Sequence, residues 1–175
     1  DIVFKDYSFS HLDYLTLELY QKITETATRL VKGKKALLSN PYTEFDFRVV
    51  PIDLIGIRDS HSERKPATAS VSKYIEGPNF RDLFKFRMIS ENNGGLILKD
   101  YPQSIKNSPW SNFFNENAEK QIIEELNNLS VYLNNTLNTK GINIVPVNVK
   151  PQRIDERNFL FITDLCSRIK SLCVR

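Results

Sequence analysis

The amino-acid sequence predicts an α+β fold, a single domain in which an antiparallel β-meander is packed on one face by about three helices. Two observations predict it. Apolar residues recur at helical spacing near the start, after the middle and at the end of the chain, whereas alternating segments are grouped between the first two helices. No repeat or linker divides the 175 residues, so we expect one domain over 1–175.

Composition limits the classes of protein that the chain resembles. Hydrophobic residues at 41% and charged residues at 26% are typical of globular proteins, and no apolar run is long enough for a membrane span. The net charge of +3 is smaller than a dedicated nucleic-acid binder usually carries. Because the chain begins at Asp1 rather than at methionine, we expect a processed product or a piece excised from a longer chain.

The segment Asn115 to Gly141 has the best-defined helix pattern. Asn115 or Asn117 suits the N-cap, carboxylates follow in the first turn, and Gly141 suits the end. We expect its apolar stripe to be core and to pack on the meander. The stripe consists of Ala118, Ile122, Leu126, Leu129, Leu133 and Leu137.

The first helix is expected over residues 11–32, after an N-terminal arm that suits an edge strand or a docking contact. Ser10 and Asp13 resemble a capping box, and Gly33 suits the helix end. Basic residues gather at that end, where they complement the negative end of the helix dipole. They are Arg29, Lys32, Lys34 and Lys35.

Strand patterns follow a turn at Asn40-Pro41. Residues 45–49 alternate as in a half-buried strand, and the change of parity after Pro51 indicates a bulge or an edge position. Residues 58–70 are polar and predict a long exposed loop before a short strand at 71–75. Alternation in Phe84–Met88, a turn at Glu91–Gly95 and apolar Leu96 and Leu98 predict a hairpin.

The C-terminal part is expected to contain a strand at 142–149, at a sheet edge because of Pro146, and then a polar turn. The last segment suits a helix from Phe161, although residues 159–162 could instead form a strand with Thr163 capping a shorter helix. Cys166 and Cys173 in one helix would be about 10 Å apart along its axis, beyond disulfide reach. Reduced thiols indicate the cytoplasm or the nucleus.

Motifs for catalysis or cofactor binding are not found in the sequence. His11 and His61 lie in unrelated settings without the paired spacing of zinc ligands. Asp59, Ser60 and His61 are the residue types of a hydrolase triad, but adjacent residues of a polar loop cannot easily adopt its geometry. We therefore expect no catalytic, metal or cofactor site. An enzyme of unfamiliar type would need a cleft where acids, histidine or tyrosine converge.

The order helix, strand meander, Tyr101-Pro102 with Pro109, and helix resembles RWD domains, the non-catalytic relatives of ubiquitin-conjugating enzymes. This resemblance implies an RWD-like docking fold. A conjugating enzyme would have a cysteine soon after the meander, whereas the only cysteines of this chain lie in its last segment, which argues against ubiquitin transfer.

We therefore expect a non-enzymatic interaction or scaffold domain, a subunit of an intracellular multi-protein assembly in the cytoplasm or nucleus of a eukaryotic cell. The candidate partner contacts belong to the polar loop or are aromatic residues suited to interfaces. They are Arg58, His61, Arg64, Lys65, Tyr74, Phe80 and Trp110.

The alternative is a modestly basic nucleic-acid-binding subunit of a larger complex. Basic and aromatic residues are interleaved over 80–87, a pattern of nucleic-acid-binding surfaces, although an amphipathic strand with buried rings explains it more simply. The candidate contacts are Lys32, Lys34, Lys35, Arg81, Lys85 and Arg87.

Overall fold

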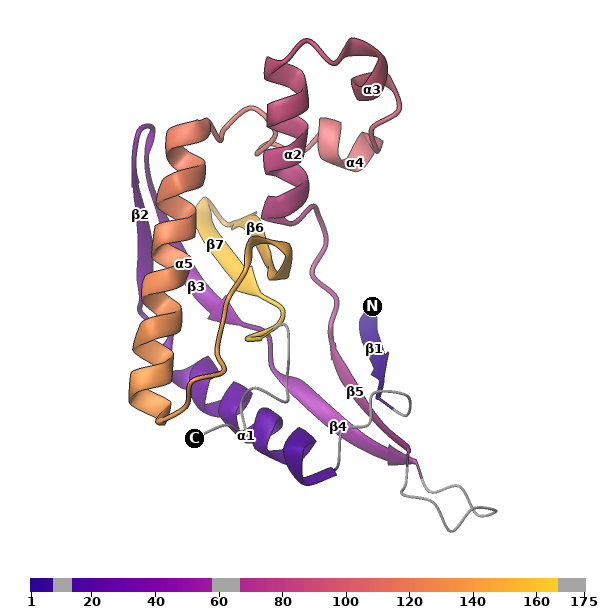
Figure 1. Cartoon of the computed structure of the whole chain (residues 1–175), viewed down its shortest axis with the longest axis vertical. Helices are drawn as coiled ribbons and strands as arrows, with labels where there is room; N and C mark the ends of the chain where they lie inside the picture. Colours follow the sequence, from indigo (N-terminus) through magenta and orange to yellow (C-terminus); the bar gives the residue numbers. More distant parts are fainter. Residues whose placement is uncertain (8–13, 58–66, 167–175) are drawn as a thin grey trace.

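A computed structural model describes residues 1–7, 14–57 and 67–166, and it confirms the α+β class (Figure 1). The helices are α1 (Tyr14–Leu30), α2 (Phe80–Glu91), α3 (Gly95–Lys99), α4 (Gln103–Lys106) and α5 (Glu116–Leu137), with a 3-10 turn η1 (Pro146–Asn148). The strands are β1 (Ile2–Asp6), β2 (Lys35–Ser39), β3 (Tyr42–Val49), β4 (Ile52–Ile57), β5 (Ala67–Lys73), β6 (Val149–Ile154) and β7 (Arg157–Ile162).

The described strands form two sheets rather than one meander. One has the order β1-β5-β4 and is antiparallel, and the other has the order β2-β3-β7-β6, in which β3 and β7 run parallel. The chain changes sheets at Val50-Pro51, where the change of parity predicted a bulge or an edge. Val50 still donates its N–H to the Ile162 carbonyl of the four-stranded sheet, whereas Pro51 has no N–H to continue the ladder.

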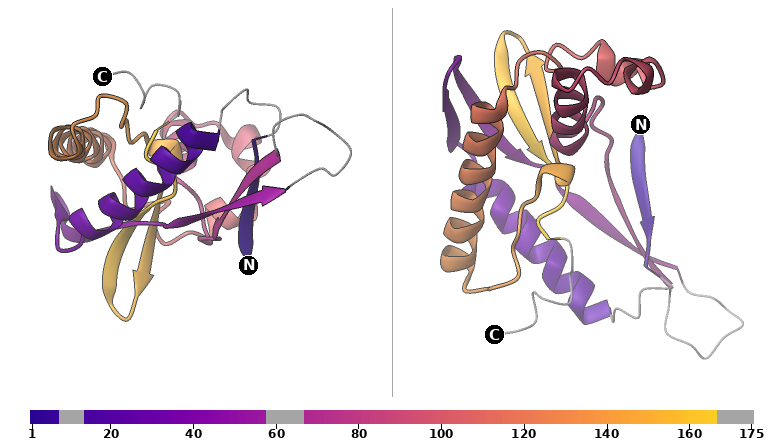
Figure 2. Two further views of the ribbon diagram at one scale, coloured as in Figure 1. Left: turned by 90° about the horizontal axis from the view of Figure 1, so that it is seen from below. Right: turned by 45° about the horizontal axis from the view of Figure 1, so that its top comes forward.

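The core lies between the four-stranded sheet and the helices α1 and α5. Ala36, Leu38 and Leu160 point inward from two of its strands and are fully buried. Figure 2 shows α1 and α5 on the same side of this sheet. The predicted stripe of α5 is confirmed as core from Ala118 to Leu133, and Leu137 packs against its border.

An aromatic cluster closes the core where α2 meets the connection between α4 and α5. The ring of Phe114 contacts Phe80 with centroids 5.0 Å apart, and Phe45 contacts Trp110 at 5.4 Å. Because Trp110 and Phe114 belong to the connection between α4 and α5, this cluster positions α5 against the sheet.

The hairpin predicted over 84–98 is wrong, because Phe80–Glu91 is the helix α2. Asn79 caps it by accepting the Asp82 N–H, and the rings of Phe80 and Phe84 stack one turn apart with centroids 5.5 Å apart. Asn93 adopts a positive φ of 55°, which ends the helix instead of turning a hairpin.

The RWD-like order is also wrong for this chain. That order places a meander strand directly before Tyr101-Pro102, but α2 and α3 lie there. Tyr101 packs against Phe86 of α2, with ring centroids 5.4 Å apart, so the tyrosine fixes the connection between α3 and α4 to α2.

The strand predicted over 142–149 is wrong except for Val149, because polar side chains of α5 replace a partner strand. Ser130 Oγ accepts the Ile144 N–H at 3.0 Å. The Asn134 amide accepts the Ile142 N–H at 3.0 Å and donates to the Ile142 carbonyl at 2.8 Å. These bonds hold the segment in an extended form without a sheet, and Pro146 then begins η1.

The C-terminal hairpin β6–β7 was not predicted as a pair, since the residues of β6 look like a polar turn. Asp155 and Glu156 connect the strands with φ of 49° and 64°, the two positive values of a type I′ turn. The strand alternative for residues 159–162 is confirmed. Cys166 is buried and follows β7 outside any helix, and the rest of the last predicted helix lies outside the described residues.

Several predicted boundaries shift. The helix α1 ends at Leu30, Gly33 follows with φ of 87°, and the capping residues Ser10 and Asp13 lie outside the described part. The helix α5 ends at Leu137, because Asn138 adopts the left-handed conformation with φ of 51° before Gly141 is reached. Strand β2, not predicted, pairs with β3 across the predicted turn at 40–41, and residues 67–70 of the predicted loop belong to β5.

Candidate protein-docking groove between α2 and α5

The candidate partner contacts do not form one site. Arg58, His61, Arg64 and Lys65 lie outside the described residues. Tyr74 is 43% exposed, as a contact residue needs to be. Phe80 and Trp110 are a correction, since they are 0% and 7% exposed and belong to the aromatic core.

The candidate nucleic-acid contacts form two separate groups. Lys34 follows α1 and lies over the ring of Tyr132, whereas Arg87 of α2 bonds to Glu119. Because Glu119 and Tyr132 are 13 residues apart on α5, these contacts are separated by about 20 Å along the helix. Lys32 and Lys35 are close to Lys34 in the sequence, and Lys35 pairs with Glu44 at 3.3 Å. The six basic residues therefore make no single patch.

A groove of about 730 Å³ lies between α2, α5 and η1. Its apolar floor is formed by Phe84 and Met88 of α2, Ile123 of α5 and Val147 of η1. Met88 is 52% exposed, and Ile123 and Val147 are each 38% exposed. Three apolar side chains from three separate elements are thus exposed to solvent around one hollow, a pattern typical of interaction surfaces.

The groove is held together by an ion-pair network. Arg87 donates to Glu91 on its own helix and to Glu119 on α5. Burial alone would lower the pKa of Arg87, but the hydrogen bonds to Glu91 and Glu119 outweigh it and raise the pKa. The Arg87 guanidinium therefore stays charged and links the two walls of the groove.

Nearby on α5, Lys120 pairs with Glu116 at 2.9 Å, one turn apart. The hydrogen bond from Lys120 lowers the pKa of Glu116. These two charges neutralise each other at the rim and leave little net charge on the α5 side.

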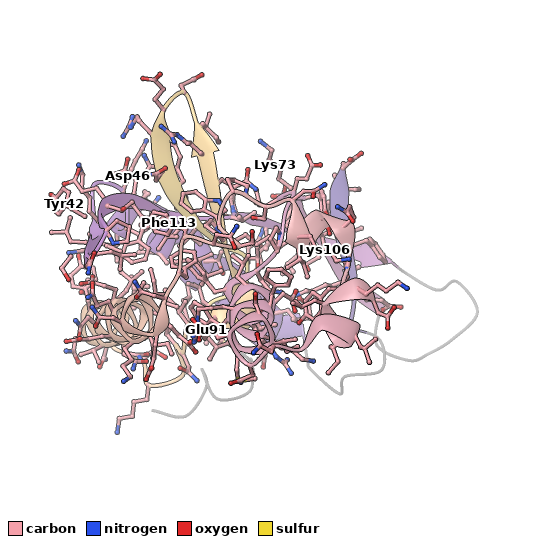
Figure 3. The ribbon with its side chains drawn as sticks, turned by 90° about the horizontal axis from the view of Figure 1, so that it is seen from above. Tyr42, Asp46, Lys73, Glu91, Lys106 and Phe113 are labelled. Atoms are coloured by element: carbon pink, nitrogen blue, oxygen red, sulfur yellow. The ribbon has the colours of Figure 1, made fainter. Side chains whose placement is uncertain are left out.

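The α2 side of the rim keeps unpaired positive charge. Arg81 and Lys85 are one turn apart, both are exposed and both line the groove. Among the described residues, no carboxylate lies within ion-pair distance of either. Figure 3 shows the molecule from above, with Glu91 labelled on α2 and with Tyr42 and Asp46 labelled on β3.

The apolar part of the groove was not predicted from the sequence, because Met88 was assigned to a strand. In a helix, Phe84 and Met88 are four residues apart and share one face, which is the signal that indicates a groove wall. On α5, Ile123 is an apolar residue beside the core stripe, which also indicates a second apolar surface.

The other convergence of titratable groups is built around Asp164. Its carboxylate accepts from the Tyr20 hydroxyl, from Lys5 Nζ at 3.1 Å and from the Cys166 N–H at 3.2 Å. Burial, with Asp164 beside it, raises the pKa of Tyr20. Because these groups bond to one another, we interpret the cluster as a clamp that ties β1 and α1 to the segment after β7.

In the described parts of the chain, His, Cys, Asp and Glu side chains nowhere gather as a set of three or more that suits a metal ion. The described helices also include none with the length and apolarity needed to cross a membrane. Comparisons with protein-family models, with curated proteins and with solved structures found no match to this chain.

Proposed function

We propose that this chain is a non-enzymatic interaction domain whose groove between α2 and α5 docks an acidic amphipathic helix of a partner protein. The observation that carries the proposal is the exposed apolar floor of Met88, Ile123 and Val147 beside the unpaired cations Arg81 and Lys85. In this role the chain serves as a subunit of an intracellular multi-protein assembly.

The shape of the groove favours a helix as its occupant. Its α2 wall has 12 residues, about 18 Å of helix, which matches three turns of a bound helix. Helices that bind in grooves use apolar anchors at i, i+3 or i+4, and i+7, spaced over two turns. Met88, Ile123 and Val147 offer contacts for such anchors from three sides.

The charge of the rim favours an acidic occupant. Arg87 and Lys120 are already paired with glutamates, so Arg81 and Lys85 are the rim cations left for a partner. Carboxylates on the partner would pair with them, while a basic helix would be repelled.

A designed pair of peptides tests the proposal. Both are helical and carry leucines at i, i+3, i+4 and i+7, one with glutamates on the flanks and one with lysines. Titration into the whole isotope-labelled chain, followed by amide NMR shifts, reports where each peptide binds. We expect the glutamate peptide to shift the amide NMR signals of Met88, Ile123 and Val147.

Matched variants locate the binding. Met88→Asp places a charge on the floor and should weaken binding about tenfold or more, and Arg81→Glu should weaken it through repulsion. Val131→Asp is the control, since Val131 is exposed on α5 and does not line the groove. Equal binding of both peptides, or equal losses in the Met88 and Val131 variants, would contradict the proposal.

A further inference from the structure

The four-stranded sheet has a second face, directed away from the core. Alternate residues of each strand belong to it, and we call it the outer sheet face, defined by Arg48 of β3, Lys150 of β6, and Arg157, Phe159 and Phe161 of β7. It shares no residue with the groove between α2 and α5, so a ligand of this face is independent of the docking proposal.

The strand register arranges aromatic and basic residues side by side. Phe161 lies opposite Arg48 on one neighbouring strand and opposite Lys150 on the other. Phe159 lies two residues before it on the same strand, with its ring centroid 5.9 Å from that of Phe161. The guanidinium carbons of Arg48 and Arg157 lie 5.2 Å and 5.4 Å from the Phe159 ring centroid.

These rings are not core residues. Leu160 and Ile162, the alternate residues of β7, are fully buried in the core cluster. Phe159 and Phe161 are half-buried and belong neither to that cluster nor to the residues packed against it. Figure 2 shows the β6–β7 hairpin extending away from the side that α1 and α5 cover.

Two cations of the outer sheet face have no carboxylate partner among the described residues. Arg157 pairs with Asp46 at 2.6 Å, which neutralises it. Arg48 instead donates to the Phe47 carbonyl, and Lys150 donates to the Ile75 carbonyl and lies over the Tyr74 ring. Burial lowers the pKa of Lys150, and the charge of Asp82 opposes this shift without forming an ion pair. Arg48 and Lys150, which form no ion pair with a described residue, therefore flank Phe161.

We propose that the outer sheet face binds single-stranded nucleic acid, with a base stacked on Phe161 and backbone phosphates beside Arg48 and Lys150. Aromatic side chains on a sheet can stack unpaired bases, and basic neighbours follow the phosphates. A duplex cannot present its bases in this way, because they are stacked within the helix. This surface uses different residues from the basic groups that the sequence suggested.

The test measures fluorescence anisotropy of a labelled oligouridylate of about 12 nucleotides, a length within the usual range of single-strand sites. The whole chain is titrated at several salt concentrations. Phe161→Leu keeps an apolar side chain but loses the ring face, and it should weaken binding at least about fivefold. Phe86→Leu is the aromatic control, since Phe86 is half-buried on α2.

Charge is tested separately, through the salt dependence. Two phosphates beside Arg48 and Lys150 predict a slope of log K against log salt near about −1.4, and Arg48→Gln should reduce its magnitude by about 0.7. Arg29→Gln removes the same charge from the end of α1, on the other side of the sheet, and should leave the slope unchanged. A thermal melt of each variant shows that it is folded.

The proposal would be overturned by no binding of the oligouridylate at low salt, by equal affinity for a duplex of the same length, or by equal affinity of the Phe161 and Phe86 variants. Displacement of the oligouridylate by an equal concentration of polyglutamate would assign the face to an acidic protein instead. An unchanged salt slope in the Arg48 variant would also count against it.

Discussion

Replacing Ser130 by alanine should destabilise the protein more than the loss of one hydroxyl group suggests. Ser130 Oγ donates to the Leu126 carbonyl at 2.8 Å and accepts the Ile144 N–H at 3.0 Å. Both Ser130 and Ile144 are buried. The substitution therefore leaves a buried N–H without its acceptor, whereas the Leu126 carbonyl keeps its bond within the helix.

The magnitude depends on two opposing effects. A buried donor left unpaired costs about 1–3 kcal/mol. Alanine is a better helix former than serine, which offsets about 0.5 kcal/mol. We expect Ser130→Ala to lower the free energy of unfolding by about 0.5–2.5 kcal/mol.

Urea unfolding of the variant and the parent measures this difference, with an unchanged m-value showing that the same surface is exposed on unfolding. Thr24→Val is the matched control. Its hydroxyl is also buried in a helix, but it donates only to the Tyr20 carbonyl at 2.9 Å, so its loss leaves no buried N–H unpaired. We expect that control to change the free energy of unfolding by no more than about 0.5 kcal/mol.

Hydrogen exchange gives a second, local readout. The amide of Ile144 should exchange faster in the Ser130 variant, whereas the amides of β3 should change only as much as global stability does. If Ser130→Ala costs no more than Thr24→Val, or if the Ile144 amide keeps its protection, then Ser130 does not serve as the hydrogen-bonding partner of Ile144.

Three further predictions concern the core, the groove and one carboxylate. Phe114→Ala should lower the free energy of unfolding by about 3–5 kcal/mol, because its ring is buried against Phe45, Phe80 and Trp110, whereas Met88→Ala should stay within about 0.5 kcal/mol in the same urea assay. A double-mutant cycle of Arg87→Ala and Glu119→Ala should give a coupling of about 1 kcal/mol that falls in high salt, and zero coupling at low salt would exclude this link between the groove walls. Burial and the nearby Glu124 raise the pKa of Glu125 above the ordinary value of 4.5, so the folded state binds the proton more tightly and stability falls as the pH rises through the window above 4.5. Glu125→Gln should therefore be more stable than the parent at pH 7 but not at about pH 3, and a constant difference across this range would contradict the assignment.

Helical spacing, capping residues and strand alternation predicted the elements whose form depends mainly on residues close in the sequence. The stripe of α5 and its cap at Asn115 follow from helical spacing and from one side-chain bond to the Ala118 N–H. The strand around Phe45 and Phe47 could also be predicted, because alternate side chains of this one strand point into the core.

The errors arose where a local signal supports two structures. Asn93 suits both a tight hairpin and a helix end, because each needs a positive φ. Phe80 and Phe84 also suit either a strand or a helix, and the cap at Asn79 with packing against Phe114 decides for the helix. This one misassignment hid the groove, since Met88 joins Ile123 only when α2 is helical.

The remaining features depend on contacts between distant segments, which spacing cannot reveal. The extended form of 142–144 depends on polar side chains of α5, and the outer sheet face depends on the register that places Arg48 opposite Phe161. From the sequence, Arg48 and Phe161 are simply members of two alternating strands. Only their pairing puts a cation beside a ring.

The parallel pairing of β3 with β7 determines when this sheet can be completed as the chain emerges during synthesis. Asp46 and Arg157 form an ion pair across 111 positions of sequence. Until β7 has been made, β3 has only β2 beside it and exposes an open edge of unpaired N–H and carbonyl groups. Contacts of such long range slow folding. A chain that has emerged only as far as α5 therefore exposes this edge of β3, and unpaired strand edges favour aggregation.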